Sequence, residues 1–207
     1  MQADRPAHKF KETRPFQLLF AIIEIVDTFS IIEKYYEPGS QSHYYLVEHG
    51  KAVANKALEI AARLSHMNPD CRFIEEAALL HDIGIFLTNF PKIGCSGAHP
   101  YISHGYLGRQ LLEKEGLPAH ALVCERHVGV GLTIDDINRN RLPLPLRDMS
   151  PQSLEEKIVC FADKFYSKDK LTLTIARSVP KVREMVVRYG EDKLQQFDEW
   201  MILFKES

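Results

Sequence analysis

The chain has 207 residues, of which 45% are hydrophobic and 26% charged, so it can bury the core of one ordinary globular domain without disulfide bonds. Its 26 basic and 28 acidic residues give a net charge of −2, which argues against stable binding to a nucleic-acid backbone. The four cysteines form no Cys-x-x-Cys pair, which argues against a structural zinc site and favours reduced thiols in the cytoplasm.

The first apolar stretch covers residues 16–32 and has to be weighed as a membrane or signal segment. Glu24 and Asp27 interrupt it, and a charge in the middle of a membrane span is costly. No small-residue cleavage site follows it. We therefore expect a helix that packs on the domain, within an N-terminal helical extension of residues 1–44, and a cytoplasmic protein that does not enter a membrane.

Helical periodicity dominates the rest of the chain. Apolar residues recur at three- and four-residue steps over residues 43–65, which predicts a helix with one buried stripe. Further helices are expected over residues 73–86, 102–115, 118–127, 153–168, 179–189 and 191–204. Residues 90–100 and 129–151 are predicted connections, and no segment shows the alternation of a strand. The sequence thus predicts an all-α, single-domain helical bundle.

Three of these helices carry polar residues on faces that are otherwise apolar. His49 lies on the stripe of the first helix, His81 and Asp82 extend the stripe of the next, and Asp163 lies among core-type side chains. A single inward histidine is more often a hydrogen-bonded core residue than a ligand, but a buried carboxylate must be paired or bind a cation. Four such residues together indicate a metal site, and imidazole with carboxylate suits Fe, Mn, Zn, Ni or Co.

The segment Leu-Leu-His-Asp-Ile-Gly at residues 79–84, with a helical histidine before it and a helical Ala-Asp after it, resembles the HD superfamily of metal-dependent phosphohydrolases. It carries the His-Asp-Ile-Gly variant of the superfamily signature. The resemblance implies an HD domain over residues 45–168, completed by C-terminal helices over residues 169–207. It also implies that the first metal is held by His49, His81, Asp82 and Asp163, with His81 and Asp82 directly engaged in catalysis.

Two further histidines, His104 and His127, fall where binuclear HD proteins place ligands of a second metal. Asp82 would then bridge the two ions, as in the similar HD-type diadenosine-tetraphosphate hydrolases and cyclic-di-GMP phosphodiesterases. The alternative for each is an ordinary histidine at a helix end. The resemblance implies two divalent ions (Fe, Mn, Ni, Co or Zn) that activate water for attack on phosphorus.

One position departs from the family pattern. Many relatives place a Lys or Arg directly after His-Asp-Ile-Gly, where its cation can hold a substrate phosphate, whereas this chain has Ile85. Candidate contacts to substrate are Lys51, His99, Arg126, Arg147 and Lys164, with the loop cations Arg139 and Arg141. Each of these cations is more often a solvated surface residue, and His99 more often structural.

The gap at Ile85 keeps other reaction classes open. A di-iron HD oxygenase, similar to inositol oxygenase, uses nearly the same ligands, and a non-catalytic nucleotide-binding regulator is a third possibility. The cyclic-di-GMP branch is weakened because no matching Gly-Tyr-Pro motif is present. We expect a small phosphorylated substrate such as a nucleotide, and a core or homodimer contact for the aromatic and methionine residues of the last two helices.

Overall fold

The structure, a computed structural model, describes residues 25–206. Helix α1 (Thr28–Tyr35) contains part of the helix expected over residues 16–32, and residues 16–24 lie outside the described residues. Asp27 begins α1 by accepting a hydrogen bond from the Ser30 backbone. Of the helices in residues 25–206, none is long and apolar enough to cross a membrane.

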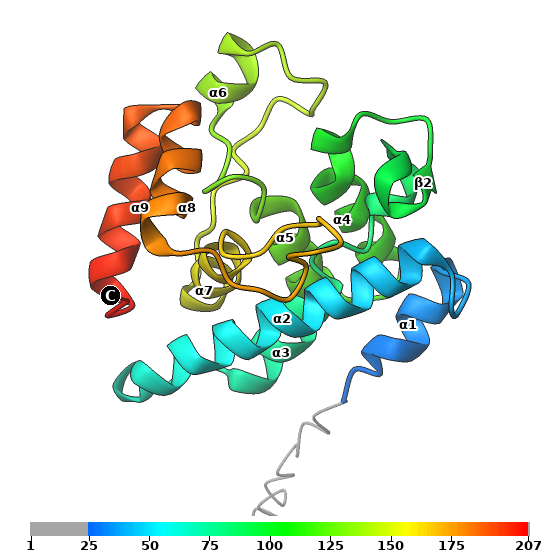
Figure 1. Ribbon diagram of the computed structural model, residues 1–207, viewed down its shortest axis with the longest axis horizontal. Helices are drawn as coiled ribbons and strands as arrows, with labels where there is room; N and C mark the ends of the chain where they lie inside the picture. The colour runs from blue at the N-terminus through cyan, green and yellow to red at the C-terminus, as the bar shows by residue number, and fades with distance from the viewer. Residues whose placement is uncertain (1–24, 207) are drawn as a thin grey trace, which may run out of the picture.

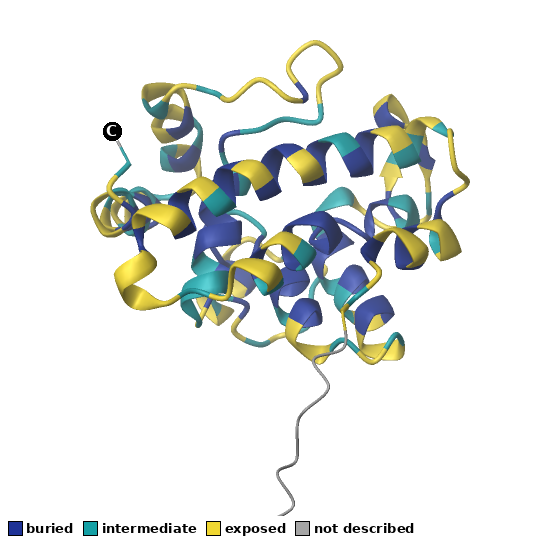
Figure 2. Ribbon diagram, turned by 90° about the horizontal axis from the view of Figure 1, so that it is seen from below, coloured by how far each residue is buried: buried dark blue, intermediate teal, exposed yellow. Residues whose placement is uncertain are grey.

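Helix α2 (Gln41–Arg63) is the longest helix of the described chain and lies against α3 (Cys71–Leu80) in Figure 1. Ser40 caps its first turn by accepting a hydrogen bond from the His43 backbone. Its apolar stripe is fully buried at Val53 and Ile60. Figure 2 shows buried and exposed residues alternating along this helix, as expected from the sequence periodicity.

The remaining helices follow in chain order, and α8 and α9 lie beside each other in Figure 1. They are α4 (His104–Lys114), α5 (Pro118–Arg126), α6 (Ile134–Arg139), α7 (Leu154–Asp163), α8 (Val179–Val186) and α9 (Glu191–Leu203). Among the described residues, strand structure is limited to the antiparallel pair β1 (Asn89–Phe90) and β2 (Cys95–Ser96), in a segment expected to be a loop. The prediction of an all-α fold is confirmed.

Two helices end earlier than their sequence predicts. Helix α3 stops at Leu80 rather than at residue 86, because the chain must pass Gly84 against the backbone of α4. Helix α7 stops at Asp163 rather than at residue 168, since the following amides bond to carbonyls only three residues back. Both corrections move polar residues from helix interiors to helix ends.

The buried apolar residues of the described chain form two clusters. The C-terminal helices complete the one that also contains residues of α2, α3 and α7. Phe161 of α7 stacks on Phe197 of α9 with ring centroids 4.9 Å apart, and meets Phe204 edge-on at 5.1 Å. All three rings are fully buried, whereas Tyr189, expected on the same packing face, is 74% exposed. Helix α7, and therefore Asp163 at its end, is held in place from this side.

Candidate metal centre

Six polar side chains from five helical segments converge at the end of the α2–α3 pair. They are His49 within α2, His81 and Asp82 just after α3, His104 at the start of α4, His127 just after α5, and Asp163 at the end of α7. The first five are buried, and the Asp163 side chain is 13% exposed. The structure brings together all six residues that the sequence proposes as metal ligands.

One carboxylate oxygen of Asp82 faces the first pair of histidines. Its Oδ2 atom lies 3.3 Å from His49 Nε2 and 3.2 Å from His81 Nε2. Asp163 Oδ1 lies 2.9 Å from the same nitrogen of His49 and 3.5 Å from that of His81. Two imidazoles and two carboxylates therefore surround one position that a cation could occupy.

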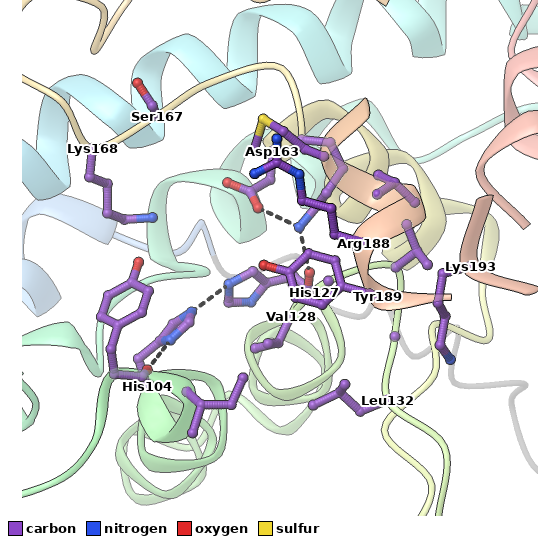
Figure 3. Close-up of a pocket in the computed structure, with 18 of the residues that line it drawn as sticks. His104, His127, Val128, Leu132, Asp163, Ser167, Lys168, Arg188, Tyr189 and Lys193 are labelled. Carbon is purple, nitrogen blue, oxygen red and sulfur yellow. Dashed lines mark hydrogen bonds and ion pairs between the residues drawn. The ribbon is translucent and has the colours of Figure 1, made fainter. Parts of the chain in front are cut away.

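The other oxygen of Asp82 faces the second pair of histidines. Its Oδ1 atom lies 3.3 Å from His104 Nε2 and 3.5 Å from His127 Nε2. The two Nε2 atoms are 3.0 Å apart, and Figure 3 shows both rings pointing into one space beside Asp163. Asp82 thus lies between two groups of ligand atoms, with one oxygen directed at each.

Backbone carbonyls orient three of the four imidazoles. The Nδ1 atoms of His81, His104 and His127 lie 2.6, 2.6 and 2.7 Å from the carbonyl three residues earlier in the chain. Because a carbonyl only accepts, each Nδ1 carries a hydrogen, and Nε2 is the nitrogen directed at the carboxylates. Hydrogen bonds of this kind usually fix the orientation of metal-binding histidines.

The donor atoms of the centre fit a divalent metal. His81 Nε2 and Asp82 Oδ1 are buried and have no hydrogen-bond partner, whereas Asp82 Oδ2 is paired with a lysine. Such unpaired polar atoms are costly in a protein interior, and coordination to a cation would satisfy them. The described residues contain two groups of ligand atoms within 4.8 Å of one another, His49–His81–Asp163 and His81–Asp82–His127.

The protonation states of all but one of these groups suit cation binding. Burial lowers the pKa of His49 to about 4 and that of His104 to about 3, so both rings are neutral near pH 7. Burial also lowers the pKa of His81, but Asp82 and Asp163 outweigh it and raise that pKa to about 9, so a cation would have to displace the proton on this ring. Burial opposes ionisation of both carboxylates, yet neighbouring cations hold their pKa values well below the usual range.

Two lysines reach the carboxylates. Lys164, a predicted substrate contact, places Nζ 2.7 Å from Asp163 Oδ2 and donates to the His127 carbonyl at 3.0 Å. Lys168, which sequence reasoning missed, places Nζ 2.5 Å from Asp82 Oδ2 and 3.2 Å from His49 Nε2. Helical spacing gave no signal for it, because α7 ends at Asp163 and the chain then turns back on the site.

A cavity of about 740 Å³ opens beside the centre. His104, His127, Asp163 and Lys168 are among the residues that line it, and Figure 3 shows the Lys168 side chain pointing toward the same space. A cavity of this size accommodates a ligand of nucleotide or metabolite dimensions. Three of the candidate ligands, His104, His127 and Asp163, therefore border a space large enough for a small molecule.

The other residues predicted as substrate contacts lie away from this cavity. None of Lys51, His99, Arg126, Arg139, Arg141 and Arg147 lines the cavity. Lys51 is exposed and pairs with Glu48, because two residues along a helix turn a side chain to the opposite face from His49. Arg126 pairs with Glu156, Arg147 pairs with the buried Glu125, and His99, Arg139 and Arg141 are exposed.

Curated relatives share part of the chain. It is 34% identical over 115 residues to a tRNA (cytidine(56)-2'-O)-methyltransferase of Picrophilus torridus, and 32% identical over 127 residues to that of Thermoplasma volcanium. It is 36% identical over 121 residues to an uncharacterized protein of Methanocaldococcus jannaschii. These matches cover 55%, 61% and 57% of this chain, respectively.

The chain spans only 30% and 33% of the two methyltransferases, and 64% of the Methanocaldococcus protein. No solved structure matches the chain significantly. Residues 46–167 match the family model of the HD domain, a segment that contains all six residues of the centre. On that match, which covers more than half of the sequence, the chain belongs to the HD-domain family.

Proposed function

We propose that the chain is a metal-dependent phosphohydrolase that cleaves a phosphoester or phosphoanhydride bond in a nucleotide or another small phosphorylated metabolite. The position of Asp82 carries this proposal, because each of its oxygens faces a separate pair of histidines. Such an arrangement could hold two divalent ions, and two-metal centres serve the hydrolysis of phosphate bonds. The number and identity of the ions belong to the proposal.

The residues of the centre have different roles in the proposed hydrolysis. Divalent ions, when bound, lower the pKa of water and neutralise charge that develops on the phosphoryl oxygens. Asp82 and Asp163 would hold the ions, and the carbonyl-anchored histidines would keep Nε2 directed at them. Lys164 and Lys168 offer cations to the phosphoryl oxygens. Water forms a new P–O bond as the bond to the leaving group breaks, and the leaving group takes up a proton from water.

The charge of the cavity favours hydrolysis over oxygenation of a neutral compound. Its lining contains six basic and three acidic side chains: Lys92, Lys164, Lys168, Arg177, Arg188 and Lys193, against Asp136, Asp163 and Asp169. An excess of cations attracts an anionic substrate and offers little to an uncharged polyol. An oxygenase similar to inositol oxygenase is therefore the weaker alternative.

Methyl transfer is not proposed, although two relatives are named tRNA methyltransferases. The match covers only a third of those proteins, and a cluster of imidazoles and carboxylates supplies metal ligands rather than a site for a methyl donor.

All four cysteines are free, which fits the reducing cytoplasm where we place the protein.

The test is metal analysis of anaerobically purified protein, followed by phosphate release from a panel of nucleotides and phosphorylated metabolites with Mn, Fe, Ni, Co or Zn. We expect about two ions per chain, both lost in Asp82→Asn because Asp82 serves both positions. Asp163→Asn should lose only one ion, since Asp163 contacts only the first pair of histidines. The exposed Asp135→Asn is the matched control.

Other outcomes would reject the proposal. Phosphate release by metal-free protein would exclude the metal-dependent reaction. Oxygen consumption by the iron form without phosphate release would favour the oxygenase. Tight nucleotide binding without turnover under every metal would favour the regulator.

A further inference from the structure

The connection between α7 and α8, residues 164–178, brings three basic side chains to the cavity beside the metal centre. Lys164, Lys168 and Arg177 all line it. The two lysines have carboxylate partners in Asp163 and Asp82. Arg177 has none among the described residues, and its guanidinium donates instead to the backbone carbonyls of Lys164 and Tyr166.

Those backbone contacts hold Arg177 in place without using up its donors. Its own amide donates to the Phe165 carbonyl at 2.7 Å, which folds the connection back onto the chain just after Asp163. Both side-chain bonds come from Nη1, so Nε and Nη2 remain available. Burial lowers the pKa of Arg177 while Asp163 raises it, as for a partly desolvated cation with a carboxylate nearby.

Charge balance points to an anion at this end of the cavity. Asp82 and Asp163 are each already matched by a lysine. Divalent ions held by the same two carboxylates would leave the lysines and Arg177 in excess. An anionic ligand is the usual way in which such a positive site is neutralised. Ile85 is fully buried and cannot supply a contact to that ligand.

We propose that Lys168 and Arg177 form the anion subsite of this cavity. Lys168 contacts the phosphoryl group at the metal centre and takes the role of the cation absent at Ile85. Arg177 binds a second anionic group of the same molecule, such as the neighbouring phosphate of a phosphoanhydride. This inference rests on the proposed function and narrows the substrate class to compounds with two adjacent anionic groups.

The experiment measures binding of the non-hydrolysable phosphonate analogues of AMP and ADP to the Mn-loaded protein by calorimetry. We expect the wild type to bind the ADP analogue about tenfold or more tightly than the AMP analogue, because Arg177 adds a charge-assisted contact. Arg177→Gln should lose this preference and keep its affinity for the AMP analogue. Lys168→Gln should lower the affinity for both analogues by a similar factor.

Matched controls lie on the same part of the chain. Lys170→Gln and Arg183→Gln change exposed cations that do not line the cavity, and both should bind the analogues as the wild type does. Arg177→Lys keeps the positive charge and should retain part of the preference for the ADP analogue. Thermal unfolding of each variant shows whether the fold is intact.

An unchanged ratio of ADP-analogue to AMP-analogue affinity in Arg177→Gln, or no preference in the wild type, would overturn the subsite. The hydrolase proposal can fail separately, because phosphate release does not enter the binding measurement. A wild type that shows the preference, loses it in Arg177→Gln and releases no phosphate would keep the subsite and reject hydrolysis. Phosphate release together with equal affinity for both analogues would keep the hydrolase proposal and reject the subsite.

Discussion

Gly84, the last residue of the His-Asp-Ile-Gly segment, explains how two distant histidines reach Asp82. A Cβ atom at this position would lie 2.5 Å from the Gly108 nitrogen, and closer still to the His104 carbonyl. Real side chains do not tolerate such contacts, so only glycine lets the first turns of α4 lie directly on this segment. His104, the first residue of α4, therefore stands next to Asp82.

Replacement of Gly84 by Ala should push α4 away from the segment. We expect a loss of about 1–3 kcal/mol in unfolding free energy from overpacking, together with weaker binding of the ion near His104. Urea unfolding and metal analysis measure the two effects. Gln110→Ala, on the exposed face of α4, should change neither. Wild-type stability and full metal content in Gly84→Ala would show that α4 does not depend on this contact.

At the residue scale, the sequence predicts which residues cluster in the centre better than which cations line the cavity. His49 and Asp163 stand out because a polar group in an apolar stripe needs a partner. Lys51 does not line the cavity, because residues two positions apart on a helix face different ways. Lys168 and Arg177 lie in an irregular connection whose path depends on tertiary packing, so no periodicity could have placed them.

At the scale of elements, the centre is built largely from helix ends. His81 and His127 follow the last residues of α3 and α5, and each ring closes a hydrogen bond to a carbonyl of the preceding turn. The last carbonyls of a helix have no backbone partner, so the imidazole satisfies one of them while it is itself oriented. Periodicity predicts that the helices exist, but their last residues depend on contacts such as that at Gly84.

Helices α6 and α9 are joined by one buried ion pair, and its strength should depend on pH. Asp136 accepts hydrogen bonds from the Thr133 amide and hydroxyl, each at 2.8 Å, and pairs with Lys193 at the start of α9. Burial raises the pKa of Asp136, but Lys193 and Thr133 outweigh it and hold the pKa below its ordinary value of 3.8. The stabilisation is thus present above pH 3.8 and is lost as pH falls through the lower, folded value.

Asp136→Asn should therefore reduce stability near pH 7 by about 1–3 kcal/mol, and the difference from wild type should shrink below about pH 4. Chemical unfolding at a series of pH values from neutral to strongly acidic measures this. Asp135→Asn, the exposed neighbour in the same helix, provides the control. A difference that stays constant across this range would mean that the charge of Asp136 contributes nothing.

At the scale of the whole molecule, the core extends beyond the segment that matches the family. The match ends at residue 167, yet α9 packs on α7 through its aromatic residues, and Glu206 pairs with Lys56 of α2 at 2.6 Å. Composition and periodicity predict the all-α class and the additional helices. They do not predict that these helices brace the far side of α7, because that depends on which apolar faces meet.

Phe197→Ala tests whether the C-terminal helices and the metal centre unfold as one unit. Phe197 is fully buried against Phe161, whose helix ends in Asp163. We therefore expect the substitution to lower the free energy of unfolding by about 3–5 kcal/mol. Circular dichroism and release of bound metal should report a single, shared thermal transition, shifted to lower temperature. Ile202→Ala, 80% exposed on the same helix, should leave that transition within about 0.5 kcal/mol of wild type.

Separate melting of the C-terminal helices would contradict this prediction. If α8 and α9 melted first while the metals stayed bound, the stacking of Phe197 on Phe161 would be dispensable for holding Asp163. Residues 169–207 would then be a separate layer rather than part of the domain. If helix signal and bound metal are lost together, residues 169–207 are part of the same cooperative domain. Asp163 then keeps its place only while α7 is packed on both sides.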